Sequence, residues 1–507
     1  MKKYLKDRST GEFYINDKKF IGEISLKGLK TSIKIWSDSV IELSKEEQRC
    51  FKGFIYDGNR YIALIDSFRL SSGQNSIKEG DNYSTRHFIE IHPRFVICGG
   101  SELQQIDGQT SKAFFSTKNL GKLFADYGSV TQLIHTTTEQ VEKLVNEDNL
   151  ESQRLFDVPP PNQVNEYVAT DNEVRPEVFI YKGSKTLLSI ESDFCHYKVR
   201  HFSGRSYCSS SSINVKVTTE FVLDFNKDTS IADVTLHVWQ LHKFLQLLSG
   251  KSDTISEFRI QLPNNNELFE VYVCTDHGET DDHSFDGLIS LRTGKQSIET
   301  LFANWFNKNP SWNMARNQVL SNFNSNSYTI DRLVSSANMF DLIPKSSANR
   351  KVDLSDELLE AKRHAKILFK ALPDSLEKQS MLGTLGRIGN KSLKHIIHDR
   401  ISIIREKSSL TLPDIDLVVN NAVDSRNYFV HGGKCKLDHE KNSQIVNFYI
   451  DTLEFIFVVS DLLECGWDID TWKASRCTNH RIGTYLCSYS FYLRLFKEAI
   501  EKPQVDN

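Results

Sequence analysis

A cation, an amide and an imidazole lie within the six residues 426–431, whose sequence is RNYFVH, and two glycines follow at once. These are the groups that a protein needs to cleave RNA without a metal ion. A 2′-hydroxyl that attacks its own phosphate requires a proton acceptor, a proton donor for the leaving oxygen and positive charge beside the phosphorane oxygens. Histidine can exchange the proton near neutral pH, and arginine binds phosphate through its planar fork. Arg426, Asn427 and His431 are therefore candidate catalytic residues.

The spacing of arginine and histidine is not specific by itself, since Arg86 and His92 are also separated by only a few residues. That stretch alternates between polar and apolar residues, which predicts a strand rather than a helix. The segment at 426–431 differs from it in three ways. Its surroundings have helical periodicity, an asparagine follows the arginine directly, and two glycines end the pattern.

A helix is predicted over residues 414–431. Pro413 and Asp414 suit its start, because proline is tolerated in the first turn and an acid is favourable at the amino end. Gly432 can adopt the left-handed conformation that ends a helix. An alternative interpretation is that Arg426 and His431 only stabilise the helix end, where cations are favoured. Helical spacing places two sets of residues on two faces of this helix. The apolar face consists of Ile415, Val418, Val419, Ala422 and Phe429, and the polar row consists of Asn420, Asp424, Asn427 and His431.

Residues 420–433, with a long amphipathic helix predicted on each side, resemble the HEPN superfamily, whose signature is Arg, a polar residue, several variable residues and then His. The region 350–500 looks most like the ApeA-like branch of that superfamily. The sequences GEFYI at 11–15 and FIGEISL at 20–26 are similar to the β-rich domain that precedes this branch. Arg426, Asn427 and His431 match the motif without departure.

The resemblance implies a helical bundle that dimerises and brings two Arg/His sets into one cleft. It also implies metal-independent RNA cleavage, without a cofactor, in defence against bacteriophage by abortive infection. His431 would act as general base toward the 2′-hydroxyl or general acid toward the 5′-oxygen, Arg426 would stabilise the phosphorane, and Asn427 would orient the imidazole or bind phosphate. Products would carry 2′,3′-cyclic phosphates, and DNA would resist because it lacks the attacking hydroxyl. Transfer RNA is the first candidate substrate, and the phage trigger is unknown.

Two other functions remain open from the sequence. In one, the bundle binds a nucleotide or a partner protein through Arg426 and His431 without cleaving anything. In the other, a structural or lectin-like β protein carries the activity in its amino-terminal part. That part contains no P-loop, no Gly-rich dinucleotide fingerprint and no Gly-x-Ser-x-Gly elbow. We therefore expect a sensor or a restraint there, because an unregulated intracellular ribonuclease would be toxic.

The composition describes an ordinary folded protein. A chain of 507 residues with 39% hydrophobic and 25% charged residues predicts two or three domains. The net charge of −4 argues against nucleic-acid binding by the whole surface. The first residues, MKKYLKD, lack the apolar region of a signal peptide. The most hydrophobic run, 448–463, contains three acids and is too short to span a bilayer, so we expect a cytoplasmic protein without membrane contact.

The predicted fold class is α+β and multidomain, with a β-rich amino-terminal region followed by an all-α bundle of the HEPN type. Short strands separated by turns, among them 88–92 and 95–98, predict a β-rich domain at 1–155, as an antiparallel sheet or barrel. After a Pro-rich linker, strands with one inserted helix predict an α+β second part at 176–345, which ends in helices. The last of these strands is predicted at 288–291. Helical periodicity then predicts the bundle at 351–500. Its helices are expected at 354–371, 374–388, 391–407, 414–431, 442–465 and 480–499.

A basic face is predicted on the helix 391–407, with an apolar stripe on its inner side. Lys391, Lys394 and His398 on the outer side are candidate RNA-binding residues, because cations beside the site would attract the phosphate backbone. The alternative is a helix whose charges are simply solvated.

Nine cysteines are scattered without any Cys-x-x-Cys pair, which favours reduced thiols. Two loose groups could in principle hold a metal, but neither has the spacing of a common zinc site. An acidic loop at 276–283 reads as a solvated hairpin tip rather than a cation site. No metal is therefore expected. The two groups are Cys195, His196, His201 and Cys208, and Cys465, Cys477, His480 and Cys487.

Overall fold

The computed structural model describes the chain from Arg8 to Glu501 with gaps. The acidic loop and most of the Pro-rich linker predicted above lie outside the described residues. Those residues are 8–15, 18–41, 50–79, 82–103, 109–126, 128–156, 178–203, 207–208, 213–214, 216–263, 265–274, 286–291, 294–323, 325, 327–346, 351–432, 437–439, 441–475 and 479–501.

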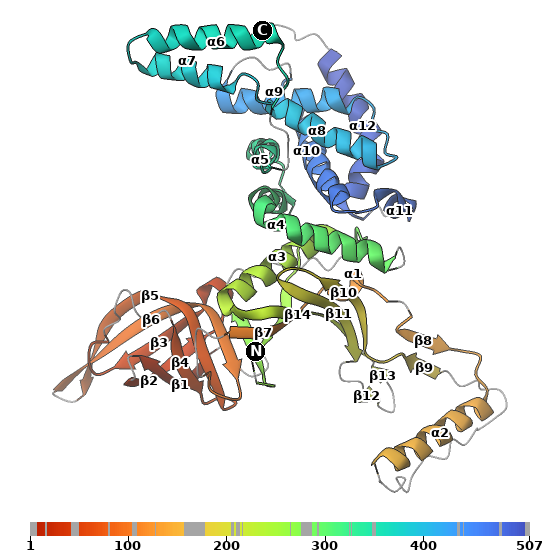
Figure 1. The fold of residues 1–507 in the computed structure, drawn as a ribbon. Helices are drawn as coiled ribbons and strands as arrows, with labels where there is room; N and C mark the ends of the chain where they lie inside the picture. The colour runs from red at the N-terminus through yellow and green to blue at the C-terminus, as the bar shows by residue number, and fades with distance from the viewer. Residues whose placement is uncertain are drawn as a thin grey trace.

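Six antiparallel strands close into a barrel at the amino end (Figure 1). They pair around the ring β1-β2-β3-β6-β5-β4, and β4 pairs again with β1. Inward side chains such as Phe13, Ile33 and Ile89 form an apolar core of their own. The strands are β1 (Ser9–Ile15), β2 (Lys18–Ser25), β3 (Ser32–Ser37), β4 (Phe51–Ile55), β5 (Arg60–Glu79) and β6 (Asn82–Gly99). A 3₁₀ turn at Gly28–Lys30 joins β2 to β3.

Strand β6 belongs to the barrel and also to a second part of the same sheet. It pairs with β5 along its length, whereas its other edge pairs with β3 at 87–91 and with β16 at 95–98. Pro93 lies between these two stretches, where the neighbour changes. The second part continues from β6 in the order β16, β15, β7, β14, β11, β10. These strands are β7 (Gln109–Thr117), β10 (Lys185–Glu191), β11 (Cys195–Ser203), β14 (Val217–Ser230), β15 (Ile255–Gln261) and β16 (Leu268–Val273).

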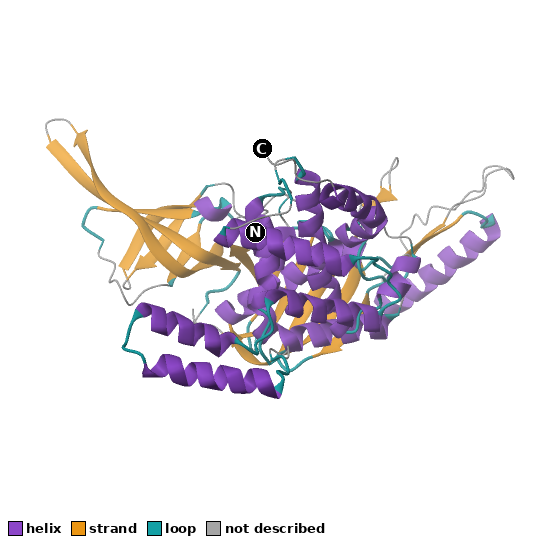
Figure 2. Cartoon of the chain, turned by 90° about the horizontal axis from the view of Figure 1, so that it is seen from above, coloured by secondary structure: helices purple, strands orange, loops and turns teal. Residues whose placement is uncertain are grey.

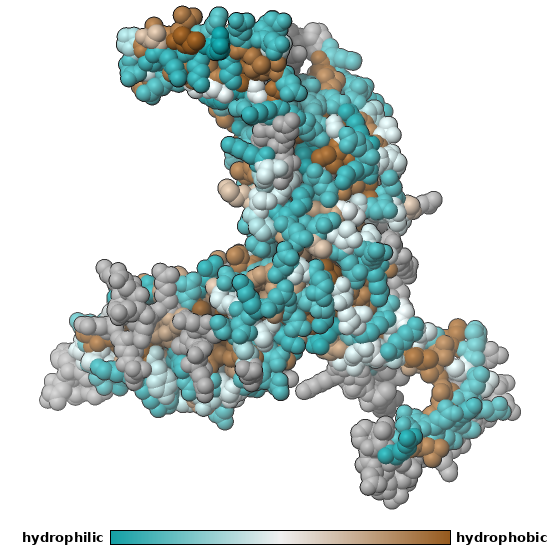
Figure 3. Space-filling model, viewed as in Figure 1, coloured by the Kyte–Doolittle hydropathy of each residue, from teal (hydrophilic) through white to brown (hydrophobic). Residues whose placement is uncertain are grey.

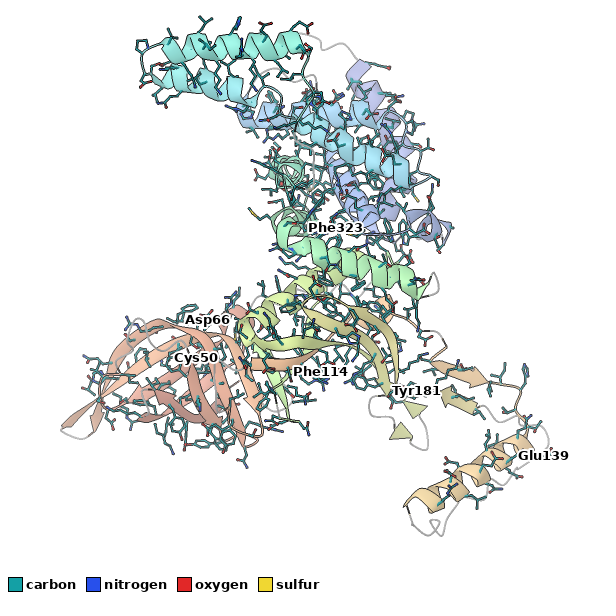
Figure 4. The ribbon with its side chains drawn as sticks, in the orientation of Figure 1. Cys50, Asp66, Phe114, Glu139, Tyr181 and Phe323 are labelled. Carbon is teal, nitrogen blue, oxygen red and sulfur yellow. The ribbon has the colours of Figure 1, made fainter. Side chains whose placement is uncertain are left out.

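Helices α3 (Ile231–Ser249) and α4 (Lys295–Phe323) cover one face of this second part (Figure 1). Stacked and edge-on aromatic rings fill the layer between them, with Phe115 against Phe221 and Phe244 against Trp305. In Figure 4, the labelled residues Phe114 on β7 and Phe323 at the end of α4 locate the sheet and the helical layer above it. The core continues without a break into the helical region, so the sheet and the bundle share one hydrophobic cluster.

The helical region is built around α10 (Ser443–Glu464), most of whose residues are buried. Three helices of this region pack against it and against one another: α5 (Ile330–Asp341), α8 (Leu393–Lys407) and α9 (Ile415–His431). Helix α12 (Arg481–Glu501) also packs on α10, and the short α11 (Ile469–Ala474) precedes it. The helical hairpin of α6 (Asp356–Ala371) and α7 (Leu376–Arg387) stands apart from this bundle (Figure 2).

Smaller elements lie at the periphery. Helix α2 (Thr138–Phe156) extends from a two-stranded sheet of β8 (Val130–Leu133) and β9 (Val178–Tyr181), which Glu139 and Tyr181 locate in Figure 4. A short helix α1 (Leu120–Leu123) and a small pair of strands, β12 (Tyr207–Cys208) and β13 (Ile213–Asn214), complete the set. Among the helices of the described residues, none combines the length and the apolar character needed to cross a bilayer.

Buried ion pairs join α4, α5 and α8 to α10. Arg316 donates to both carboxylate oxygens of Asp461, at 2.8 and 3.1 Å. Arg332 makes the same paired contact with Glu454, at 2.8 Å twice. Arg400 donates to Glu464 at 2.8 Å and to the hydroxyl of Ser460 at 2.8 Å. Five of these six charged side chains, all but Glu464, and Ser460 are buried, so each buried charge depends on its partner.

The predicted fold class is confirmed, because a β-rich amino-terminal region is followed by helices. The predicted strand at 288–291 is wrong. Its backbone is held instead by indole groups of the bundle, since Trp467 and Trp472 donate to the carbonyls of Leu288 and Gly287. The strands predicted at 88–92 and 95–98 form one strand, β6. The six helices predicted in the bundle are confirmed, with ends within two residues, as α6 to α10 and α12. The division into three domains stays a prediction.

One carboxyl group gives the helical region a dependence on pH. Asp451 on α10 accepts from the hydroxyl of Tyr328, and burial raises its pKa to about 6, with a further contribution from Glu454. The folded protein therefore holds this proton more tightly than the unfolded chain, and the free energy of unfolding falls as the pH rises between about 4 and 6. We expect Asp451→Asn to gain stability relative to the parent between pH 4.5 and pH 7.5, measured by urea unfolding. The exposed Asp331→Asn is the control. An equal difference at both pH values would contradict the assignment.

Candidate catalytic site

Helix α9 carries the motif at its carboxyl end and is fixed by its apolar face. Gly432 ends the helix with φ +75° and ψ −172°, a conformation that is almost restricted to glycine, and its N–H donates to the carbonyl of Tyr428 at 2.9 Å. The expected positive φ is confirmed, although ψ is extended rather than left-handed helical. The helix begins at Ile415, one residue after the predicted start, and the side chain of Asp414, which occupies the N-cap position, pairs with Lys497. The buried residues of α9 are Ile415, Val418, Val419, Ala422, Val423 and Ser425.

Arg426 is held by two amide oxygens and lies beside His431. Its Nη2 donates to Oδ1 of Asn338 on α5 at 2.7 Å, and its Nη1 donates to Oδ1 of Asn427 at 3.0 Å. The same Nη1 lies 3.5 Å from Nε2 of His431. Arg426 and Asn427 are half-buried, whereas His431 is exposed. One helix end therefore brings all three predicted catalytic residues together, with the imidazole open to solvent.

The positive charge of Arg426 is not neutralised by a contact with an acid. Asn338 and Asn427 are neutral, and within the described part of the chain no carboxylate lies at ion-pair distance from this guanidinium. Its Nε is buried and without a hydrogen-bond partner there. An arginine that is positioned by neutral acceptors retains its full positive charge for an incoming anion, which suits stabilisation of a phosphorane.

Three predicted RNA-binding residues are arranged differently, because each of them already contacts an acid. Lys391 pairs with Asp399 at 2.7 Å, and Lys394 pairs with Asp424 at 2.7 Å. His398 lies 2.8 Å from Asp416 and 3.1 Å from the amide oxygen of Asn420. RNA binding by Lys391, Lys394 and His398 stays a prediction, and each would have to exchange a carboxylate for a phosphate.

Two residues next to the motif gave no pattern in the sequence. Asn338 stands 88 residues before Arg426, and nothing in the spacing of α5 indicates the contact. His439 stacks on Tyr428 with ring centroids 5.6 Å apart and also meets Phe429 at 4.5 Å. Burial lowers the pKa of His439, with Asp438 acting in the opposite direction. This imidazole packs against the motif helix on the side of its aromatic residues.

Metal ligands do not gather anywhere among the described residues in a group of three or more. Cys195 and His201 point to the inner face of β11, while His196 points to the other face. His480 is buried, and its Nε2 meets the carbonyl of Leu247 at 3.0 Å. Cys477 and the side chain of Cys208 lie outside the described residues.

Two family models match the chain. One, described as ApeA N-terminal domain 1, matches residues 8–305, and the other, described as Apea-like HEPN, matches residues 334–471. The first match alone covers more than half of the chain. The chain belongs to the ApeA-like HEPN family. Comparison with curated proteins and with solved structures gave no match.

In this ApeA-like HEPN protein, the HEPN match begins inside α5 and includes the whole of α8, α9 and α10. The motif helix and the helix that supplies Asn338 therefore lie in the same matched unit. Helix α4, which supplies Arg316, lies partly between the two matches. The predicted family is confirmed.

Proposed function

We propose that this ApeA-like HEPN protein is a metal-independent endoribonuclease that cleaves cellular RNA in defence against bacteriophage by abortive infection. The observation that carries the proposal is the pair of Arg426 and His431, 3.5 Å apart at the open end of α9. HEPN domains are typically ribonucleases, and family membership supports a role in defence. Transfer RNA is the first substrate to test.

The reaction assigned to the site is an intramolecular phosphoryl transfer within the RNA, from the 5′-oxygen to the 2′-oxygen. The 2′-oxygen attacks phosphorus, the bond from phosphorus to the 5′-oxygen breaks, one proton leaves the 2′-hydroxyl and one reaches the 5′-oxygen. His431 accepts the first proton or donates the second. A second copy in a homodimer would supply the other imidazole. Arg426 stabilises the negative charge of the phosphorane, and Asn427 holds Arg426 in place.

Incubation of the purified full chain with total bacterial RNA in EDTA tests this function. We expect RNA fragments with 2′,3′-cyclic phosphate and 5′-hydroxyl ends, and we expect single-stranded DNA to remain intact because it lacks the 2′-hydroxyl. Mapping the ends identifies the substrate. Absence of cleavage, both alone and with extract from phage-infected cells, would overturn the proposal in favour of a binding module.

The β-rich region is proposed to restrain the site or to sense the phage. The continuous core supports such a role, because the sheet cannot shift without repacking α3 and α4 beneath the bundle. Cells that express the full chain or its His431→Ala variant are grown with and without phage. Growth arrest that depends on both His431 and infection supports the restraint. Equal arrest without phage would rule it out.

Asn338 is expected to position Arg426 for the reaction. Asn338→Ala removes the 2.7 Å acceptor of Nη2, so the guanidinium loses its fixed orientation. A hydrogen bond to a charged group contributes ~1.5–3 kcal/mol, which predicts a fall in kcat of about 10-fold or more. Steady-state kinetics on the mapped RNA should show the change in kcat with KM nearly unchanged.

The matched control is Ser335→Ala, which lies on the same helix and donates to Asn322 rather than to the site. Asn338→Asp gives a second check, because its carboxylate would hold Arg426 but neutralise its charge. We expect this variant to be no better than Asn338→Ala. A kcat within twofold of the parent for Asn338→Ala would contradict a positioning role.

A further inference from the structure

Tyr428 is an exposed aromatic residue in the last turn of the motif helix. Exposed apolar residues occur elsewhere on the molecule, for example over the α6–α7 hairpin, where they are brown in Figure 3. Tyr428 is set apart by its position, because it follows Arg426 closely and stands one turn before His431. It is 38% exposed, so part of its ring meets solvent beside the candidate catalytic residues.

Helical geometry places Tyr428 next to the imidazole. Residues three apart on a helix are neighbours, with Cβ atoms ~5–6 Å apart. At about 100° per residue, His431 lies between Asn427 and Tyr428 around the axis of α9. Asn427 holds the guanidinium of Arg426 on one side of the imidazole. The ring of Tyr428 therefore flanks the imidazole on the other side.

Two rings support Tyr428 from one direction. The ring of His439 lies nearly parallel to that of Tyr428, with an interplanar angle of 12° and centroids 5.6 Å apart. Phe429 meets Tyr428 edge to face at 5.2 Å and also lies 4.5 Å from His439. Because Phe429 and His439 contact each other, both lie on the same side of Tyr428. The exposed part of Tyr428 therefore belongs to its other side, while the two rings hold its orientation.

The stack of Tyr428 and His439 is uncharged at neutral pH. Burial lowers the pKa of His439, with Asp438 acting in the opposite direction, so the imidazole is neutral near pH 7. Arg426, which no carboxylate among the described residues contacts, supplies positive charge on the far side of His431. A flat neutral ring beside a free cation suits a nucleotide, whose base stacks on the ring while its phosphate meets the cation.

We propose that Tyr428 stacks on an unpaired RNA base next to the phosphate on which Arg426 and His431 act. A base is joined to its phosphate through one ribose, so a phosphate at Arg426 leaves the base within reach of a ring one turn away. Bases inside a duplex are already stacked and paired, so the site selects nucleotides in loops and single strands. This inference rests on the proposed function for the class of ligand, and it adds the residue that selects unpaired nucleotides.

Equilibrium binding to the full chain provides the test, with His431→Ala present in every protein so that no probe is cleaved. Three fluorescent probes are compared by anisotropy: a short single-stranded RNA, the same strand annealed to its complement, and an abasic strand of equal length that keeps the phosphates and 2′-hydroxyls. The single strand should bind about 10-fold or more tightly than either other probe. Adding Tyr428→Leu should weaken binding of the single strand about 10-fold and leave the abasic strand unchanged, because only a base can stack.

Two further variants separate stacking from support of the helix end. Tyr428→Phe keeps the ring and should bind the single strand within about threefold of His431→Ala alone. Phe491→Leu is the matched control, because it removes a ring that is 50% exposed on another helix, α12, and should change none of the three affinities. Equal weakening of the single strand and the abasic strand by Tyr428→Leu would mean that the residue only supports the helix end, which overturns the inference.

The inference and the proposed function fail separately in this design. A chain that discriminates the three probes through Tyr428 but cleaves no RNA retains the stacking site and loses the nuclease. A chain that cleaves RNA, yet binds the single strand equally well with Tyr428→Leu, retains the nuclease and loses the stacking site. Absence of any binding by His431→Ala to the single strand also overturns the inference.

Discussion

Replacing His431 by alanine is expected to slow RNA cleavage by about 10²–10⁴-fold, because the site loses the group that exchanges the proton in the transition state. His431 is exposed, and its described contact is the 3.5 Å approach to Arg426. The change therefore removes chemistry without opening a cavity in the core. The measurement is the single-turnover rate on the RNA identified by end mapping, with far-ultraviolet circular dichroism as the check on folding.

The control for this variant is His395→Ala, which removes another exposed imidazole from the same bundle. His395 lies on α8, with Nδ1 2.7 Å from the hydroxyl of Ser392. Its loss should change the rate by no more than about twofold, as expected for a surface substitution away from the site. Equal rates for His431→Ala and the parent would remove His431 from the mechanism and leave Arg426 as a binding group.

Asp461→Ala is expected to destabilise the helical region by about 3–5 kcal/mol, because it leaves Arg316 buried without its counter-charge. Asp461 is 1% exposed, and Arg316 is also 1% exposed. Burial alone would raise the pKa of Asp461, but Arg316 and Lys308 outweigh it, and the pKa lies below its ordinary value. Urea unfolding followed by tryptophan fluorescence should report the loss, since Trp305 lies directly on the guanidinium of Arg316, 3.5 Å from the ring centroid.

The double variant Arg316→Met with Asp461→Leu distinguishes the contribution of the two charges from that of the volume their side chains fill. Apolar replacement of both partners removes two desolvated charges together, so it should be less damaging than Asp461→Ala alone. Lys308 keeps its second partner, Glu464, at 2.9 Å in this variant. If the free energy of unfolding of Asp461→Ala lies within about 1 kcal/mol of the parent value, the pair is not a structural link between α4 and α10.

The same ion pairs limit where the chain can be divided. Arg316 and Arg332 stand on α4 and α5, before the predicted bundle boundary at 351, yet their acids are on α10. A fragment that starts at 351 would lose the arginines that pair with Asp461 and Glu454, together with the two helices that pack on α10, and would also lack Asn338. Any truncation meant to release the catalytic site should therefore retain α4 and α5.

The sequence predicted the parts of the fold that depend on local periodicity. The helices around the motif and the inner stripe of α8 were recoverable because apolar residues recur at helical spacing. Leu288 shows the limit of this reasoning. Its apolar neighbours look like a strand, but the backbone there is bonded by two indoles from far along the chain, Trp467 between α10 and α11 and Trp472 on α11.

The candidate site was predictable where its residues lie on one helix. Arg426, Asn427 and His431 lie close together in sequence on α9, and the resemblance to the family indicated their catalytic roles. Asn338 could not be found in this way, since tertiary packing alone brings α5 to α9. Asp424, which pairs with Lys394, was missed because it lies on α9 and the helical pattern of α8 carries no information about its neighbours. Asp399, which pairs with Lys391, lies on α8 itself. Arg400 was missed for the same reason, as a cation inside an apolar stripe.

Strand β6 is the hydrogen-bonded link between the barrel and the sheet beneath the helices. Its 18 residues would span about 60 Å if fully extended, and it pairs with β5 over most of its length, with a register shift between Arg69 and Ser71. Its other edge pairs with β3 in the barrel and with β16 in the sheet that α3 and α4 cover. Moving the barrel relative to that sheet would therefore require the pairs of β6 with its neighbours to bend or to break.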